Sequence, residues 1–412
     1  MVISLKRIRE IEWLPLITAL LLMCNLGPFY VWGLYANPLM RYVTIVLCCI
    51  PFFFKRRKLT NKDIIVVFFW VITIITYLIV GFFNSLTIFG VAARFLTTLT
   101  VFVLYSKKDF LRSVFDYFVL IYSILVFLAF ISWVLFLLGL APDLGTLHSP
   151  METDREFQHY PFFVVEGFLT GNIRFSGPFD EPGIIGTISA LILCIKKFNL
   201  RKISSIIALI SGIVSFSLFF YLVALIFYTF YSVVVKKRIW TVIVVAAGIW
   251  LLYDNTKDHI IIQELVWNRM ELDSSKKDDV RITRTSAEGR AFYKKSIGSS
   301  EWFWGLPDPS NYLKMTEGSS TYMNVIMLNG AVFFFLYMLT LVLYMTKKLS
   351  KAQLFLALFI IAANMYQRPD VFGIVIFFLY ACLGENAGDD YLTACSTKRH
   401  IILLPPKVYN DD

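Results

Sequence analysis

Charged side chains are scarce in this chain of 412 residues. Asp, Glu, Lys and Arg together make up 17% of it, whereas hydrophobic residues make up 58%. Soluble domains usually carry about 25% charged residues, and no single soluble domain could bury this much apolar surface. Gly (21) and Pro (14) stay at ordinary levels, which excludes collagen-like and low-complexity chains. The composition therefore predicts a polytopic integral membrane protein.

Metal-binding and nucleotide-binding motifs are also missing from the sequence. The histidines, at positions 148, 159, 259 and 400, have neither HExxH nor HxxxH spacing. No Walker loop, GxGxxG motif or nucleophile elbow is present. The six cysteines lie in apolar runs or in the C-terminal tail, so neither a disulfide framework nor a CxxC metal knuckle is expected. We therefore expect no metal ion and no cofactor.

Apolar runs recur along the chain, and a spanning helix needs about 20 such residues. The runs lie at 13–33, 39–54, 63–80, 86–105, 113–140, 182–195, 203–217, 218–235, 239–253, 321–346 and 352–383. The last run contains the polar, proline-containing stretch 364–370, which is costly in lipid and breaks a helix. We expect this run to form two short segments, giving an all-α protein with about 12 transmembrane helices.

Basic residues cluster in short segments between the apolar runs. The clusters are Lys6–Arg9, Lys55–Lys58, Lys107–Arg112, Lys196–Lys202, Lys236–Arg238 and Lys347–Lys351. The intervening short turns 34–38 and 81–85 contain no Lys or Arg. By the positive-inside rule, this alternation predicts that the N-terminus and the C-terminus are cytoplasmic. The net charge of +10 then reflects membrane topology, and we expect no nucleic-acid partner.

Two long polar segments fall on the outer side in this topology, and we expect the second to fold partly against the membrane through its tryptophans. The expected organisation is 1–140, transmembrane helices one to five; 141–181, first long extracytoplasmic loop; 182–253, helices six to nine; 254–320, second long extracytoplasmic loop; 321–384, helices ten to twelve; and 385–412, a polar cytoplasmic tail. The first apolar run lacks a small-residue cleavage site, so we interpret it as a retained signal-anchor helix.

The segment Asn172–Gly183 combines charged residues with glycine and proline just before an apolar run. Pro182 suits the first position of a helix, which puts Asp180 or Glu181 at a helix N-terminus, where the dipole favours an anion. One interpretation is therefore a capping carboxylate. The other is catalytic, because Arg174 lies a few residues upstream. A basic and an acidic group together at the membrane surface suit a diphosphate leaving group and a sugar hydroxyl.

The second long segment contains three arginines within ten residues, Arg281, Arg284 and Arg290. Arginine side chains bind diphosphates without a metal ion, although Arg290 could instead pair with Glu288. Asn324, in the stretch that leads into the next apolar run, could bind a sugar or cap that helix. These residues extend the candidate site to the second outer segment.

Two further candidates lie within or between apolar runs. Arg94 is placed well inside the fourth run, where a charge costs at least about 2.5–3.5 kcal/mol. It could contact phosphate within the bundle, or it could form a structural pair or reach toward the surface. Ser217, with Ser211 and Ser215, lies around an outer turn. These serines could donate to sugar or phosphate, or they could allow close helix packing.

The topology and several of these motifs resemble one bacterial family. The long outer segments follow the fifth and ninth apolar runs, and the motifs are Phe179–Pro182, Ser215–Ser217 and Gly289–Arg290 followed by Glu317–Asn324. This order resembles the polysaccharide polymerases of the O-antigen, capsule and exopolysaccharide systems (the Wzy type), which are related to the O-antigen ligases. The resemblance extends over most of the chain.

The resemblance implies a GT-C-like, metal-independent glycosyltransferase in the bacterial inner membrane. The donor would be a growing chain on undecaprenyl diphosphate, and the acceptor an incoming lipid-linked repeat unit. Membrane lipid and a chain-length-regulating protein are the further candidate partners. Arg290 and Arg174 would stabilise the departing diphosphate, and Glu181 would act as the base. The substrate-binding candidates are Arg94, Arg284, Arg281, Asp180, Ser217 and Asn324.

Two other functions remain open from the sequence. An O-antigen ligase would use the same donor, but such ligases are expected to have a functional histidine in the second outer segment, where only His259 lies, at its start. A lipid-linked oligosaccharide flippase or transporter would have ionisable groups distributed through many helices. Arg94 is the only Lys or Arg well inside an apolar run, which disfavours transport.

Overall fold

The computed structural model describes residues 12–83, 88–149, 156–166, 174–259, 263, 286–316, 321–367 and 369–385. Two candidates, Arg281 and Arg284, lie outside the described residues. Helices account for 74% of the structure and strands for 4%, which confirms a mostly helical fold. Among these described residues, three helices are long and apolar enough to cross a membrane, or up to five if each of two bent helix pairs is one span. The other apolar helices have 10–17 residues.

The helices of the first half follow the expected apolar runs. In chain order they are α2 (Trp13–Asn25), η1 (Phe29–Val31), α3 (Trp32–Tyr35), α4 (Pro38–Phe54), α5 (Asn61–Phe83), α6 (Ile88–Thr98), η2 (Leu99–Tyr105) and α7 (Lys108–Leu137). The first run was expected to be one segment and is bent by 90° between α2 and η1. Gly27, with a φ of 70°, and the following Pro28 explain the break, because a helix accommodates neither.

The second half is also helical after a short sheet. Its helices are α8 (Pro182–Ile195), α9 (Ile203–Val214), α10 (Leu218–Phe230), η3 (Tyr231–Val235), α11 (Trp240–Thr256), α15 (Ala287–Ser296), α16 (Ser300–Trp304), α17 (Ser310–Met315), α18 (Tyr322–Asn329), α19 (Ala331–Thr346), α20 (Lys351–Gln367) and α21 (Ile374–Gly384). The division of the last run into α20 and α21 is confirmed. The run 321–346 was expected to be one segment, but it bends by 120° between α18 and α19.

Gly330 lies at this second bend. Its φ is 84°, and a Cβ atom there would lie 2.4 Å from the carbonyl oxygen of Phe303. Glycine therefore serves two needs, since it adopts the left-handed conformation and leaves room for the backbone of α16. Any side chain at this position would push α16 away from the bend.

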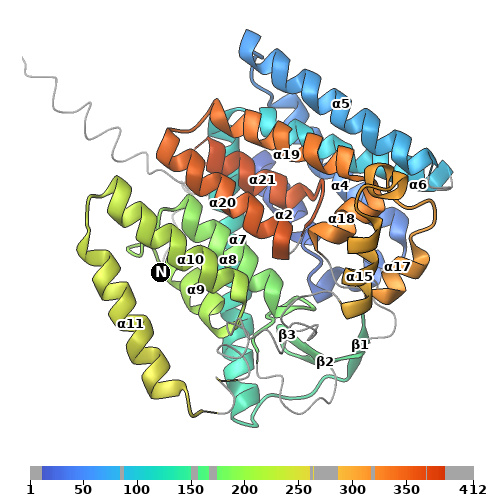
Figure 1. Ribbon diagram of the computed structural model, residues 1–412. Helices are drawn as coiled ribbons and strands as arrows, with labels where there is room; N and C mark the ends of the chain where they lie inside the picture. Colours follow the sequence, from blue (N-terminus) through green and yellow to red (C-terminus); the bar gives the residue numbers. More distant parts are fainter. Residues whose placement is uncertain are drawn as a thin grey trace, which may run out of the picture.

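Two short helices form the centre of the bundle. Every residue of α8 except Pro182 and Ile184 is buried, and every residue of α21 except Leu383. A helix that is apolar all round is stable in contact with other helices on every side. The 14 residues of α8 extend over only about 21 Å, so α8 is shorter than a membrane is thick. Figure 1 shows α8 and α21 among the other helices and α11 at the edge.

The first outer segment is not the simple loop that the sequence analysis expected. It contains the strands β1 (Thr146–His148), β2 (Glu156–Tyr160) and β3 (Phe163–Glu166), which form one antiparallel sheet in the order β1-β2-β3. Phe157 and Val164 pack with Trp32, and the ring of Phe163 lies 5.6 Å from that of Phe136 on α7. The sheet is therefore fixed to the bundle by aromatic side chains on two helices, α3 and α7.

The described part of the second long polar segment folds onto α18, and the expected folding against the membrane stays a prediction. Leu306, Tyr312 and Met327 form a buried cluster that also contacts Trp302. The backbone N–H of Leu306 donates to the carbonyl of Met327 at 2.8 Å. These contacts attach α15, α16 and α17 to the bent pair α18–α19.

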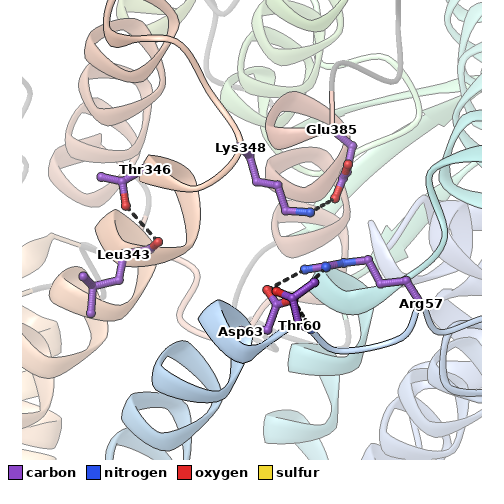
Figure 2. Close-up of polar contacts among 7 residues, drawn as sticks. All are labelled: Arg57, Thr60, Asp63, Leu343, Thr346, Lys348 and Glu385. Carbon is purple, nitrogen blue, oxygen red and sulfur yellow. Dashed lines mark hydrogen bonds and ion pairs between the residues drawn. The ribbon is translucent and has the colours of Figure 1, made fainter.

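The basic loops of the described residues meet at one end of the bundle. The N–H of Lys107 donates to the carbonyl of Lys55 at 2.8 Å. Both terminal nitrogens of Arg57 donate to the carboxylate of Asp63 at 2.9 Å, next to an ion pair between Lys348 and Glu385 (Figure 2). A small hollow at this end is lined by residues that include Lys197, Tyr231, Leu349, Gln353 and Leu383. We call this face the basic end.

Candidate functional site

The segment 174–181 lies against the turn between α9 and α10. The guanidinium of Arg174 donates through Nε to the carbonyl of Ser215 and through Nη2 to the carbonyl of Phe216, both at 3.2 Å. The N–H of Phe175 donates to the carbonyl of Val214 at 3.2 Å. The structure therefore brings together two motifs that are about 40 residues apart in the sequence, with the arginine oriented by two neutral acceptors.

Other elements hold the same segment. Ser176 Oγ donates to the carbonyl of Val164 at 2.7 Å, which attaches the segment to β3. The N–H of Phe29, on η1, donates to the carbonyl of Pro178 at 2.9 Å. Gly177 has a φ of 59°, and a Cβ there would lie 2.9 Å from Ile185 Cδ1. The segment is thus a rigid junction between the sheet, η1 and the beginning of α8.

The carboxylates of the segment lie at the beginning of α8. Pro182 occupies the first helical turn, as predicted, and Glu181 is the N-cap residue. Glu181 thus has the N-terminal position that the capping interpretation expects, although its side chain makes no capping hydrogen bond. Arg174, Asp180 and Glu181 are all half-buried. The segment therefore presents one guanidinium and two carboxylates around a helix that is itself enclosed by protein.

Ser217 is buried between α8 and α10. A Cβ atom at Gly186 would lie 2.2 Å from Ser217 Cβ and 3.1 Å from Ser215 Oγ. The serine turn and α8 are thus in direct contact at a glycine. This position agrees with the packing interpretation of the serines, because small residues allow helices to approach closely.

Arg290 lies in the first turn of α15. The N-cap residue Ser286 accepts a hydrogen bond from the N–H of Gly289 at 3.0 Å, and its hydroxyl donates to the carbonyl of Met315. These bonds fix where α15 begins and attach it to α17. Arg290 is half-buried and is three residues before Tyr293, so both side chains lie on one face of the helix.

A row of tyrosines continues from this face. The ring of Tyr293 lies 6.2 Å from that of Tyr322 at an interplanar angle of 83°. The ring of Tyr322 in turn lies 6.2 Å from that of Tyr366 at 24°. We call Tyr293, Tyr322 and Tyr366 the tyrosine row. Nothing in the sequence predicts this row except one local signal, the three-residue spacing between Arg290 and Tyr293.

Asn324 is buried in the first turn of α18. Its Oδ1 accepts a hydrogen bond from the hydroxyl of Tyr312 at 3.3 Å, and Thr321 is the N-cap residue of α18. Asn324 thus lies in the first turn of α18 and not at its N-cap position. Burial raises the pKa of Tyr312, so its hydroxyl remains protonated and donates to Asn324, which joins α17 to α18.

Arg94 is packed against α5. Its Nη1 donates to the carbonyl of Tyr77 at 3.1 Å, and its guanidinium lies 4.6 Å from the centre of the Tyr77 ring. A Cβ at Gly81 would lie 2.8 Å from Arg94 Cδ. A carbonyl and an aromatic face satisfy a guanidinium well inside a membrane. These contacts agree with the structural alternative for Arg94, and a phosphate contact stays a prediction.

Arg174 and Arg290, the two arginines expected to stabilise the diphosphate, are held by different elements of the fold. Arg174 is held by the turn before α10, whereas Arg290 belongs to α15, which lies beside α18. Figure 1 shows α9 and α10 on the left of the bundle and α15 and α17 on the right, with the sheet below. The convergence of both guanidinium groups on one diphosphate stays a prediction.

No family model matches this chain, and no curated protein or solved structure matches it either. Among the described residues, no group of three or more His, Cys, Asp or Glu side chains could hold a metal ion. The function is therefore inferred from the contacts of this chain's own residues.

Proposed function

We propose that this protein is a membrane glycosyltransferase that joins oligosaccharide repeat units linked to undecaprenyl diphosphate into an O-antigen, a capsule or an exopolysaccharide. The observation that carries the proposal is the contact of the segment 174–181 with the serine turn at the beginning of α8. It gives a cation fixed by two backbone carbonyls, in the same short segment as two carboxylates that precede an enclosed helix, away from the basic end. We further infer about 12 membrane crossings in a GT-C-like arrangement.

The proposed topology puts the basic end in the cytoplasm. Loops rich in Lys and Arg are retained on the cytoplasmic side of a membrane, and the loops that carry Lys55, Lys107, Lys197 and Lys348 meet at this end of the bundle. The segment 174–181, the sheet and the α15–α17 unit then face the outer side. Lipid-linked repeat units are joined on that side of the inner membrane, so substrates would meet these residues there.

The chemistry follows from the charge that develops in the reaction. The acceptor hydroxyl attacks the anomeric carbon of the donor, the bond from that carbon to the diphosphate oxygen breaks, and undecaprenyl diphosphate leaves with the electron pair. Glu181 takes the proton of the attacking hydroxyl. Arg174 and Arg290 stabilise the departing diphosphate, because guanidinium groups that are already oriented need no reorganisation in the transition state. Confinement of both substrates to one membrane supplies proximity.

The test is elongation by the purified full-length protein in proteoliposomes, with lipid-linked repeat units isolated from the host. Wild-type protein is expected to produce a ladder of longer lipid-linked glycans. Glu181→Gln and Arg290→Ala should each reduce elongation by about 100-fold or more, which is the loss expected for a catalytic base or a charge-stabilising group. Lys295→Ala, an exposed residue on another face of α15, is the matched control and should leave the ladder unchanged.

The alternatives give different products in cells that lack the protein. Loss of a polymerase leaves single repeat units attached to the cell surface, whereas loss of a ligase leaves unattached polymer. Loss of a flippase leaves lipid-linked units on the inner side of the membrane. The proposal is refuted if wild-type protein fails to lengthen lipid-linked units, or if both site variants still produce wild-type ladders.

A further inference from the structure

The tyrosine row joins three elements that are far apart in the sequence. Tyr293 belongs to α15, Tyr322 to α18 and Tyr366 to α20, and successive ring centres lie 6.2 Å apart. Tyr366 keeps 52% of its surface exposed, so the row ends in an accessible ring. Arg290, at the other end, shares a helix face with Tyr293. The row is therefore a series of neighbouring rings with one accessible end, and Arg290 shares a helix face with the ring at the other end.

The row lies at the end of the bundle away from the basic loops. The helix α20 begins at Lys351, next to the ion pair of Lys348 with Glu385, and has 17 residues. Such a helix rises by about 25 Å, so Tyr366, near its last residue, is on the opposite face. Tyr322 and Tyr293 belong to the unit built on the outer bend of α18 and α19.

We propose that the tyrosine row binds pyranose rings of the lipid-linked glycan, which assigns a saccharide subsite and thereby rests on the proposed function. The C–H bonds on one face of a pyranose carry partial positive charge, and the face of a tyrosine ring is negative. Tyr366 supplies the exposed ring and Tyr322 the adjoining half-buried one. Arg290 then lies at the diphosphate end of the same ligand, which orients the glycan along the row.

The main competing explanation is membrane anchoring. Tyrosine is enriched at membrane interfaces, so an exposed tyrosine at a helix end could simply sit among lipid headgroups. The chain offers a matched control in Tyr253, which is 49% exposed and lies near the end of α11, a helix that also runs away from the basic end. An interfacial role would make Tyr253 and Tyr366 equivalent, whereas a saccharide subsite would not.

The experiment measures binding by the full-length protein in nanodiscs. The probe is a set of free oligosaccharides released by mild acid from the host's own polysaccharide, and binding is followed by saturation-transfer NMR. Tyr366→Leu is expected to weaken binding by about three- to tenfold, the loss expected for one aromatic contact. Tyr366→Phe keeps the ring and should bind within about twofold of wild type, as should Tyr253→Leu.

Three results would overturn the subsite: no binding of the oligosaccharides by wild-type protein, unchanged binding by Tyr366→Leu, or equal losses in Tyr366→Leu and Tyr253→Leu. Elongation of lipid-linked units is assayed separately. Binding that depends on Tyr366 without any elongation would refute the polymerase and leave the saccharide subsite in place. Elongation by wild type with unchanged binding in Tyr366→Leu would refute the subsite alone.

Discussion

The helices α8 and α11 are both apolar, but they differ in how much of each is buried by neighbouring protein. Nearly all of α8 is buried, whereas α11 has no buried residue. The two helices also differ in what surrounds their glycine residues. Gly186 on α8 touches the serine turn, while a Cβ atom at Gly248 on α11 would have no neighbouring atom within 4 Å. An apolar helix can thus be enclosed by protein, as α8 is, or left exposed at the edge of the bundle, as α11 is, and close contacts at glycine distinguish the two.

The difference in burial between α8 and α11 also affects where a functional site can form. The segment with Arg174 and Glu181 begins the enclosed helix, where neighbouring elements fix its position on every side. A helix that is surrounded by lipid could not orient a charged group in this way, because lipid offers no directional hydrogen bonds. Sites that need fixed charges are therefore expected at the ends of α8 and not of α11.

The largest effect is expected from alanine at Gly186. The new Cβ would lie 2.2 Å from Ser217 Cβ, so α8 and the serine turn must separate, at a cost of about 1–3 kcal/mol in the free energy of unfolding. Gly248→Ala on α11 meets no atom and improves helix propensity by up to about 1 kcal/mol. Thermal unfolding of both variants in one detergent measures the difference, and equal unfolding temperatures would show that α8 is not tightly packed there.

An intermediate effect is expected from Ser189 on α8. Its hydroxyl lies 2.8 Å from the hydroxyl of Tyr122 and 3.1 Å from that of Ser211. Ser189→Ala removes a partner from both buried groups and should cost about 1 kcal/mol. Thr256→Ala on α11 removes a hydroxyl that donates to the carbonyl of Leu252 in its own helix and should change stability by less than about 0.5 kcal/mol. Chemical unfolding curves for both variants test this ranking.

The smallest effect concerns pH at the sheet that holds the segment 174–181. Burial lowers the pKa of His159, while Asp143 acts in the opposite direction. The folded sheet therefore favours the neutral imidazole, and the unfolded chain takes up a proton at higher pH. The stabilising contribution is complete above about pH 6.5 and declines as pH falls below that value.

Hydrogen exchange measures this local effect. After correction for intrinsic rates, the β2 amides should lose protection between about pH 7.5 and about pH 5.5, whereas the amides of α11 should not. His159→Gln removes the titrating group and should abolish the difference. Loss of protection that persists in this variant would assign the pH dependence to another group.

Much of the fold could be predicted from patterns along the chain. The polar stretch 364–370 predicted the break between α20 and α21, because Pro369 and its polar neighbours do not continue an apolar helix. The bends at Gly27 and Gly330 were missed, because each lies within a run whose average hydropathy stays high despite the interruption by Asn25, Gly27 and Pro28 or by Asn329 and Gly330. The sheet was missed as well, because its strands have only three to five residues and are stabilised by distant aromatic side chains.

The residue types of the candidate site could be predicted from the sequence. Only some of the contacts between these residues could be predicted. Arg174 and the serine turn were both singled out, and the structure joins them through the carbonyls of Ser215 and Phe216. Arg94 was given two alternatives, and its contacts with Tyr77 favour the structural one. The tyrosine row could not be foreseen, because its members lie on three helices whose proximity depends on how α15 docks onto α18.

The sequence by itself determined that this is a helical protein with apolar segments separated by basic and polar loops, because hydropathy and charge act locally on each segment. Only the tertiary structure decided which apolar helix is enclosed by protein, which arginine is satisfied inside the bundle, and which aromatic rings lie next to one another. These features depend on contacts between residues far apart in the chain, and such contacts produce no periodic pattern in the sequence.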